Sequence, residues 1–341
     1  MCVIWGAPCL LAVSHGYQLN GERDLYDQWW QSGLGSVTSR GELAVEPNPG
    51  AGHYGNWAAS PHWSLQANAE WGLTFGLGIW NLYAGFLGNA TFYPTLDFFN
   101  RHAESVDVAT TTSAFVSFRD SLDTDDTARF PEATFGTVNV SGEAGLNGAR
   151  MQLIAEAFKA YGARVDDVNE AKSRKSVVQK KGMFLNDVCW RCWPGNYAKF
   201  MDQLNATETS VGYWRVGDVE EPYGRFARGL HQQSGKSAIR LKLQSGFASA
   251  HRDVAGLLHT SLRVVYFDNG AGWTLTYPSA GGGRGVAMCI NHTGTGRWMD
   301  ATANITVAAV GESEGGEFDF ELRSLRDETD PIFSLIEVMV V

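Results

Sequence analysis

Two glutamates, Glu70 and Glu132, have the sequence surroundings expected of working carboxylates. Glu70 stands in the otherwise apolar stretch "ANAEWGLTFG", where a carboxylate must be paired or hydrogen-bonded if it is buried. Glu132 lies in the acidic segment "DSLDTDDTARFPEATFG". Cleavage of a glycosidic bond needs two carboxyl groups, one protonated as general acid and one ionised as base or nucleophile. These two glutamates are therefore the catalytic candidates, whereas Asp24 and Asp27 are more simply explained as acids at the start of a helix.

Polar and aromatic residues follow two apolar strand candidates. His15 and Tyr17 come after "LLAVS", and Trp80, Asn81 and Tyr83 come after "TFGLGI". In a barrel of βα units the active groups lie at the C-terminal ends of the strands. Together with Trp273 of the C-terminal region, these residues are the expected sugar contacts.

The sequence gives little support to metal or redox chemistry. Asp123, Asp125 and Thr127 begin like a calcium loop, but Ala128 replaces the required glycine and Thr134 stands where the closing glutamate belongs. The motif "CWRC" has redox spacing, yet a proline follows closely and argues against the helix that such a site needs. No second cysteine pair is present for zinc. We therefore expect no metal and no cofactor.

Composition excludes some classes of partner. The 341 residues carry a net charge of −10, which disfavours nucleic-acid binding, and the basic run "KSRKSVVQKK" is best explained as a solvated loop. Hydrophobic residues make up 44% of the chain, enough for two domains with large cores. The 12 tryptophans can fill these cores, stack on sugar rings, or do both.

Five Asn-x-Ser/Thr sequons suggest a secreted or extracellular glycoprotein, although the N-terminus lacks the Lys or Arg of a signal peptide. The sequons begin at Asn89, Asn139, Asn205, Asn291 and Asn304.

No run is long and apolar enough to predict a transmembrane helix.

Three regions differ in their patterns. Residues 1–105 alternate strand and helix candidates, as in βα units on a parallel sheet, with a helix predicted at 95–105. Residues 106–207 look mixed and mainly helical, with helices predicted at 146–167 and 195–206.

Residues 208–341 contain short strands separated by turn signals, which predict a β-sandwich or jelly roll. The segment "SLRVVYFDNGAGWTLTY" is predicted to form a hairpin of two strands, 263–267 and 273–277, with a turn at Asp268-Asn269-Gly270. In this region Trp214, Tyr223, Trp273 and Trp298 are either exposed sugar contacts or core residues.

Several segments resemble large secreted proteins of carbohydrate-active type. They are "YDQWWQSGLG", "RDSLDTDDTARFPEATFG", "LNDVCWRCWPGNYAKFMDQL", "TSVGYWRVGDVEEPYGRFARGL" and "LRVVYFDNGAGWTLTY". The C-terminal part resembles a galactose-binding-like jelly roll. More loosely, "LLAVSHGYQLNGERDLYDQWW" and "LGIWNLYAG" resemble late barrel segments of the α-1,3-glucanase (mutanase) type of glycoside hydrolase. Leu82 stands where that family has an aspartate, so the resemblance supplies no acid at this strand end.

The sequence as a whole predicts an α/β, partly βα-barrel-like N-terminal region followed by an all-β sandwich. The predicted function is that of a carbohydrate-active protein, similar to a glycoside hydrolase, that acts on or binds polysaccharide. The alternatives are a non-catalytic carbohydrate-binding or cell-surface module, or a truncated inactive fragment. An enzyme should show two carboxylates about 5 to 10 Å apart in a cleft. A binding module should show an exposed aromatic platform instead, and a fragment should show a large exposed apolar patch.

Overall fold

The computed structural model describes most of the C-terminal half of the chain and shorter stretches before it. The described residues are 11–13, 43–45, 66, 69–70, 73, 79–80, 88–103, 107–118, 127–138, 148–157, 197–217, 225–279, 283–307 and 318–341. The chain forms two compact units. The first comprises Met1–Val106, Ser121–Pro194 and Trp214–Arg225, and the second comprises Asp107–Asp120, Gly195–Tyr213 and Phe226–Val341. None of the helices described here is long and apolar enough to cross a membrane.

Short parallel strands appear in the first unit. Strands β1 (Leu11–Val13), β2 (Leu43–Val45) and β3 (Ile79–Trp80) form a parallel sheet in the order β1-β2-β3. Residues 66, 69–70 and 73, between β2 and β3, are helical. The parallel pairing agrees with the predicted βα units, but the described residues do not form a barrel.

The described helices lie mainly in the first unit. The 3-10 turn η1 (Ala90–Phe92) leads into α6 (Tyr93–His102), which confirms the helix predicted at 95–105 and carries a proline in its first turn. Helix α8 (Gly148–Ala157) confirms the described part of the helix predicted at 146–167. The short helix α7 (Glu132–Phe135) follows Pro131.

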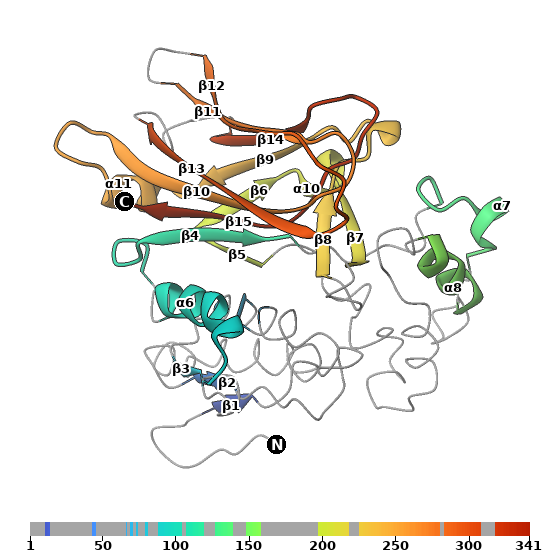
Figure 1. The fold of residues 1–341 in the computed structure, drawn as a ribbon, viewed down its shortest axis with the longest axis horizontal. Helices are drawn as coiled ribbons and strands as arrows, with labels where there is room; N and C mark the ends of the chain where they lie inside the picture. The colour runs from blue at the N-terminus through green and yellow to red at the C-terminus, as the bar shows by residue number, and fades with distance from the viewer. Residues whose placement is uncertain are drawn as a thin grey trace. The chain divides into compact units, whose positions relative to one another are not determined.

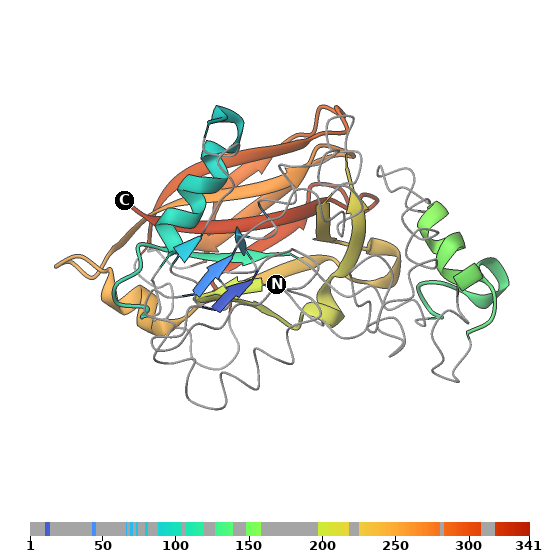
Figure 2. The same cartoon turned by 90° about the horizontal axis from the view of Figure 1, so that it is seen from below.

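The second unit is a sandwich of two antiparallel sheets, which Figure 1 shows as stacked layers and Figure 2 shows from below. The strands of the five-stranded sheet lie in this order: β12 (Arg284–Ile290), β11 (Trp273–Pro278), β14 (Phe320–Ser324), β9 (Ala238–Leu243) and β6 (Met201–Leu204). Five strands of the seven-stranded sheet lie in this order: β13 (Trp298–Val307), β10 (Leu258–Phe267), β15 (Ile332–Val340), β4 (Ser113–Ser117) and β5 (Tyr197–Lys199). Its remaining strands are β8 (Arg225–Gly229), beside the start of β15, and β7 (Val211–Val216), beside β8. Three helical turns complete the unit: α10 (Ala206–Thr209), η4 (Gln232–Ser234) and α11 (Ser245–Ala250).

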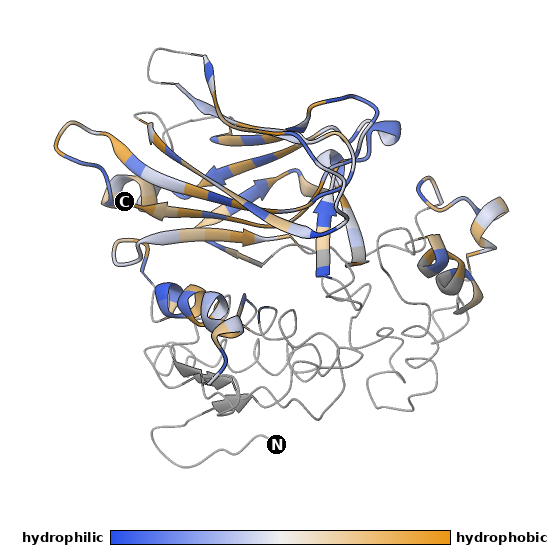
Figure 3. Ribbon diagram, viewed as in Figure 1, coloured by the Kyte–Doolittle hydropathy of each residue, from blue (hydrophilic) through white to orange (hydrophobic). Residues whose placement is uncertain are grey.

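Alternation along the strands builds the core between the two sheets. In β9, Ile239, Leu241 and Leu243 are fully buried, and they belong to the same hydrophobic cluster as Val264 and Ile336 of the facing sheet. Figure 3 shows the matching alternation of hydrophilic and hydrophobic residues along β9 and β14. Because successive side chains of a strand point to opposite faces, each buried residue places its neighbours on the outer face. The predicted β-sandwich is therefore confirmed.

The predicted hairpin at 261–277 is wrong, because its two strands belong to different sheets. Strand β10 pairs with β13 and β15, whereas β11 pairs with β12 and β14. The rings of Tyr266 and Trp273 meet across the core, edge to face, with centroids 5.2 Å apart. The loop with Gly270 and Gly272, both at positive φ (86° and 107°), carries the chain from one sheet to the other.

The helix predicted at 195–206 is also wrong. These residues form β5 and β6, which lie in different sheets, and Phe200 turns the chain between them with φ at 60°. Pairing with β4 and β9 supplies the backbone hydrogen bonds that a helix would otherwise make. Tertiary pairing therefore overrides the local helical preference.

Candidate functional site

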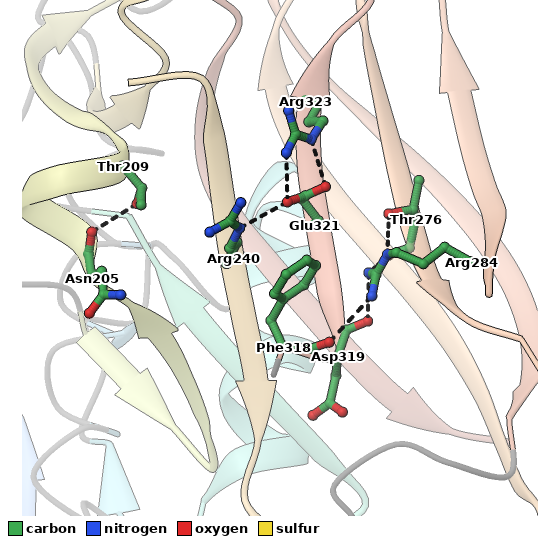
Figure 4. A network of polar contacts seen from close by, with 9 residues as sticks. All are labelled: Asn205, Thr209, Arg240, Thr276, Arg284, Phe318, Asp319, Glu321 and Arg323. Carbon is green, nitrogen blue, oxygen red and sulfur yellow. Dashed lines mark hydrogen bonds and ion pairs between the residues drawn. The ribbon is translucent and has the colours of Figure 1, made fainter. Parts of the chain in front are cut away.

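The outer face of the five-stranded sheet carries a group of charged and hydroxyl side chains, which we call the arginine face. Five of its members alternate with core residues on three neighbouring strands: Arg240 (β9), Glu321 and Arg323 (β14), and Thr274 and Thr276 (β11). The sixth is Arg284, the first residue of β12. Figure 4 shows most of this group, together with Phe318 beside it.

Strand register brings the arginine face together. Glu321 pairs with Arg240 across β14 and β9, and with Thr276 across β14 and β11. The Arg240 Nε donates to Glu321 Oε2 at 2.9 Å. Arg323 donates from Nε to Oε1 at 2.6 Å and from Nη2 to Oε2 at 3.2 Å. One carboxylate thus holds two guanidinium groups in fixed positions, one of them through the two-pronged geometry that arginine favours.

Arg284 is held differently, through uncharged oxygen atoms. Its guanidinium donates to Thr276 Oγ1 at 3.0 Å and to the carbonyl oxygens of Thr276, Phe318 and Asp319 at 3.1, 3.3 and 3.0 Å. The Phe318 ring lies near two guanidinium groups, with its centroid 4.4 Å from Arg284 Cζ and 4.9 Å from Arg240 Cζ. Cation–π contact therefore fixes both arginines relative to one aromatic ring (Figure 4).

The ionisation of the group follows from these contacts. Burial by itself would raise the pKa of Glu321, but hydrogen bonds from Arg323 and Arg240, with their positive charges, lower this pKa overall. Burial lowers the pKa of Arg284; Glu321 and Asp319 raise it, and Arg240 and Arg323 lower it again. Glu321 is therefore ionised at neutral pH, where its carboxylate holds Arg240 and Arg323 in place. The positive charges of the arginines lie close enough to repel one another.

A second polar cluster lies where β10 ends. Asp268 is buried, and its carboxylate accepts hydrogen bonds from the backbone N–H and hydroxyl groups of Thr293 and Thr295, at distances between 2.6 and 2.9 Å. Burial alone would raise the pKa of Asp268, but these four hydrogen bonds outweigh it and place the pKa well below the usual range. The cluster fixes the loop between β12 and β13, so its role is structural.

The two predicted catalytic glutamates lie in different surroundings. Glu70 is in a helical segment, is 3% exposed and accepts a 2.6 Å hydrogen bond from Gln66 Nε2, as the sequence argument on pairing requires. Glu132 is exposed in the first turn of α7, where it accepts a 2.8 Å bond from the Val138 N–H. Their catalytic roles stay predictions.

The predicted sugar contacts are described only in part. His15, Tyr17, Asn81 and Tyr83 lie outside the described residues, and Trp80 is described only as part of β3. Trp273 is fully buried between Tyr266 and Phe333, with ring centroids 5.2 and 5.5 Å away. This position does not fit a sugar contact and agrees with the alternative that aromatic residues fill the sandwich core.

Sequence reasoning missed the arginine face, although a signal was present. The segments "SAIRLKL" and "EFDFELRS" both place charged residues between buried ones, so their charges must lie on the outer face of one sheet or two. The sequence does not show that β9 and β14 pair with each other in one sheet. Among the described residues, no group of three His, Cys, Asp or Glu side chains could hold a metal ion.

Four of the five sequon asparagines are described, and all four are exposed: Asn89, Asn205, Asn291 and Asn304. Exposure is what attachment of a glycan requires. Secretion and glycosylation stay predictions.

Comparisons with known proteins give structural likenesses for part of the chain. No family model and no curated protein matches it. A carbohydrate-binding module (CBM6cm-2) of Cellvibrio mixtus lichenase 5A, solved with cellotriose, is 15% identical over 42% of this chain and 88% of the module, with a TM-score of 0.19. The CBM22-1 xylan-binding domain of Paenibacillus barcinonensis Xyn10C is 9% identical over 42% of this chain and 86% of that domain, with a TM-score of 0.23. At such scores these likenesses add nothing to the strand pairing, which defines the antiparallel sandwich by itself.

Proposed function

We propose that the sandwich is a non-catalytic carbohydrate-binding module that binds polysaccharide across the outer face of its five-stranded sheet. The observation that carries this proposal is the arginine face, a set of hydrogen-bonding groups held rigidly on a sheet. Recognition of a sugar depends on a few polar groups placed accurately against its hydroxyls. Side chains fixed by their neighbours lose little conformational freedom on binding, so each hydrogen bond contributes more to affinity.

The shape of the site also favours a polymer. Strands of a sheet lie about 4.8 Å apart, and side chains on one face recur about every 6.8 Å along a strand. A polar row that spans β9, β14 and β11 therefore offers contacts to more than one sugar unit. A binding role needs no acid pair, and neither Glu321 nor the buried Asp319 is placed as a free general acid, because both carboxylates accept hydrogen bonds from the protein.

The proposal is tested with the full chain and a panel of neutral and acidic polysaccharides, by affinity electrophoresis and calorimetry, with release of reducing sugar measured in parallel. We expect binding without release. The double variant Arg240→Ala/Arg323→Ala should weaken binding at least tenfold, as expected for loss of two clustered arginine contacts. Arg326→Ala is the matched control, because Arg326 is exposed and lies beyond the end of β14. An equal loss of affinity in Arg326→Ala, or no binding by the wild-type protein, would contradict the proposal.

A further inference from the structure

We infer that the ligand of the arginine face is an acidic polysaccharide, whose sugars carry carboxylate or sulfate groups. This inference rests on the proposed function, because it names the chemical class of the glycan that the same site would take.

The first argument is the charge balance of the site. Glu321 is shared by Arg240 and Arg323, whereas Arg284 directs its bonds to a hydroxyl and to carbonyl oxygens. The other nearby carboxylate, Asp319, is buried and accepts a 2.8 Å bond from the Leu243 N–H. Three guanidinium groups therefore lie near two carboxylates, which leaves one positive charge in excess, and an anion would reduce the repulsion between the arginines.

The second argument is the supply of unused donors. Arg240 uses only its Nε toward Glu321, and Arg323 uses its Nε and Nη2. Within the described part of the chain, the two Nη atoms of Arg240 and the Nη1 of Arg323 have no hydrogen-bonding partner. These side chains are 38% and 46% exposed, so the donors can reach solvent or a ligand. Paired N–H groups of a guanidinium match the oxygen atoms of carboxylate and of sulfate.

The third argument is the contrast between this face and other surfaces. The chain carries a net charge of −10, so polyanions are not attracted to it in general, and binding would have to be local. A site for neutral sugars would be expected to present a flat aromatic side chain. The aromatic ring beside this face, Phe318, is only partly exposed and lies against Arg240 and Arg284. Of the sandwich tryptophans and tyrosines whose burial is described, Trp273, Tyr213 and Tyr266 are buried, and Tyr277 and Trp298 are only partly exposed.

Matched pairs of polymers test the inference. The full chain is titrated with polygalacturonate against fully methyl-esterified pectin, and with dextran sulfate against dextran, because each pair shares a backbone and differs in charge. We expect at least tenfold tighter binding of one or both charged members, as expected for charge-assisted contacts, and a marked fall in affinity at high salt. The charged member that binds identifies carboxylate or sulfate as the recognised group. Equal binding of the neutral members would overturn the inference but keep the proposed function, whereas binding of none would contradict both.

Two further measurements separate a glycan site from simple charge attraction. Poly-L-glutamate has carboxylates but no sugar, and binding of it as tight as that of the acidic glycan would overturn the inference. Arg240→Gln and Arg323→Gln should each weaken binding of the charged polymer about tenfold, whereas Arg326→Gln should leave it unchanged.

Discussion

Glu321 on β14 lies directly opposite Arg240 on β9, and a 2.9 Å hydrogen bond joins Oε2 of the glutamate to Nε of the arginine. The side chain of the glutamate is 7% exposed, and that of the arginine is 38% exposed. The pair therefore combines a buried acceptor with a donor group that still reaches solvent. This combination suits recognition better than stability, since half-exposed ion pairs stabilise proteins only weakly.

A double-mutant cycle on Arg240→Ala and Glu321→Ala should show this weak coupling. We expect a coupling energy of about 0.5–1 kcal/mol in the free energy of unfolding, measured by urea denaturation. Combining Glu321→Ala with Arg326→Ala, beyond the end of the strand, should give a coupling near zero. A coupling several times larger would mean that the pair exists for stability, and would weaken the case for a binding face.

Asp268 should contribute far more to stability than Glu321. Asp268→Asn removes the charge that accepts four hydrogen bonds from Thr293 and Thr295, and we expect a loss of about 2–4 kcal/mol. Its folded pKa is depressed below the unfolded value of about 3.9, so its stabilisation is complete above about pH 5 and declines as the pH falls further.

Urea denaturation of wild type and Asp268→Asn between pH 7 and pH 2.5 checks this prediction. The difference in unfolding free energy should shrink as the pH falls through the carboxyl range. Asp327→Asn, at an exposed position, is the control for loss of one negative charge and should cost little at any pH. A difference that does not depend on pH would show that the ionised carboxylate is not the stabilising form.

The sandwich could be predicted because its strands carry their pattern locally. The alternation in "SAIRLKL" and "EFDFELRS" indicates which side chains of β9 and β14 face the core, whereas β15 is buried on both faces from Ile332 to Val338. Helix α6 is likewise visible in the sequence, and Phe98 and Phe99 lie on its buried face together with Thr95 and His102.

The pairing of the strands could not be predicted, because it joins segments that lie far apart in sequence. The run from Asp268 to Gly270 looks like a hairpin turn, yet β10 finds its partners at residues 298–307 and 332–340. The arginine face has the same origin, since Arg240 and Glu321 are 81 residues apart. The abundance of tryptophan is also misleading, because it suggests Trp273 as a sugar contact, whereas this ring lies in the core.

Gly272 should tolerate no side chain. Its φ is +107°, and a Cβ there would lie 2.1 Å from the Ile290 carbonyl oxygen, where β11 pairs with β12. Gly235 has a φ of +76°, and nothing lies within 4 Å of its Cβ position. An alanine there meets no other atom, so its cost is only that of the left-handed backbone conformation. We expect Gly235→Ala to lower the free energy of unfolding by about 1 kcal/mol, and Gly272→Ala by clearly more, because backbone must also move. Urea denaturation measures both, and equal effects would mean that the strand pairing at Ile290 is looser than this geometry.

Trp273 distinguishes the core role from a role in sugar binding. Its ring is fully buried between Tyr266 and Phe333, so Trp273→Ala should cost about 3–5 kcal/mol, as for other large core residues.

Trp273→Phe should cost clearly less than Trp273→Ala. The indole N–H is buried and has no hydrogen-bond partner among the described residues, so its removal offsets part of the lost packing. Thermal melts measure the stabilities, and calorimetry on the folded Trp273→Phe protein measures polysaccharide affinity, which should equal that of wild type. A stable Trp273→Phe protein with weakened binding would show that the ring reaches the ligand, and would move the binding site away from the arginine face.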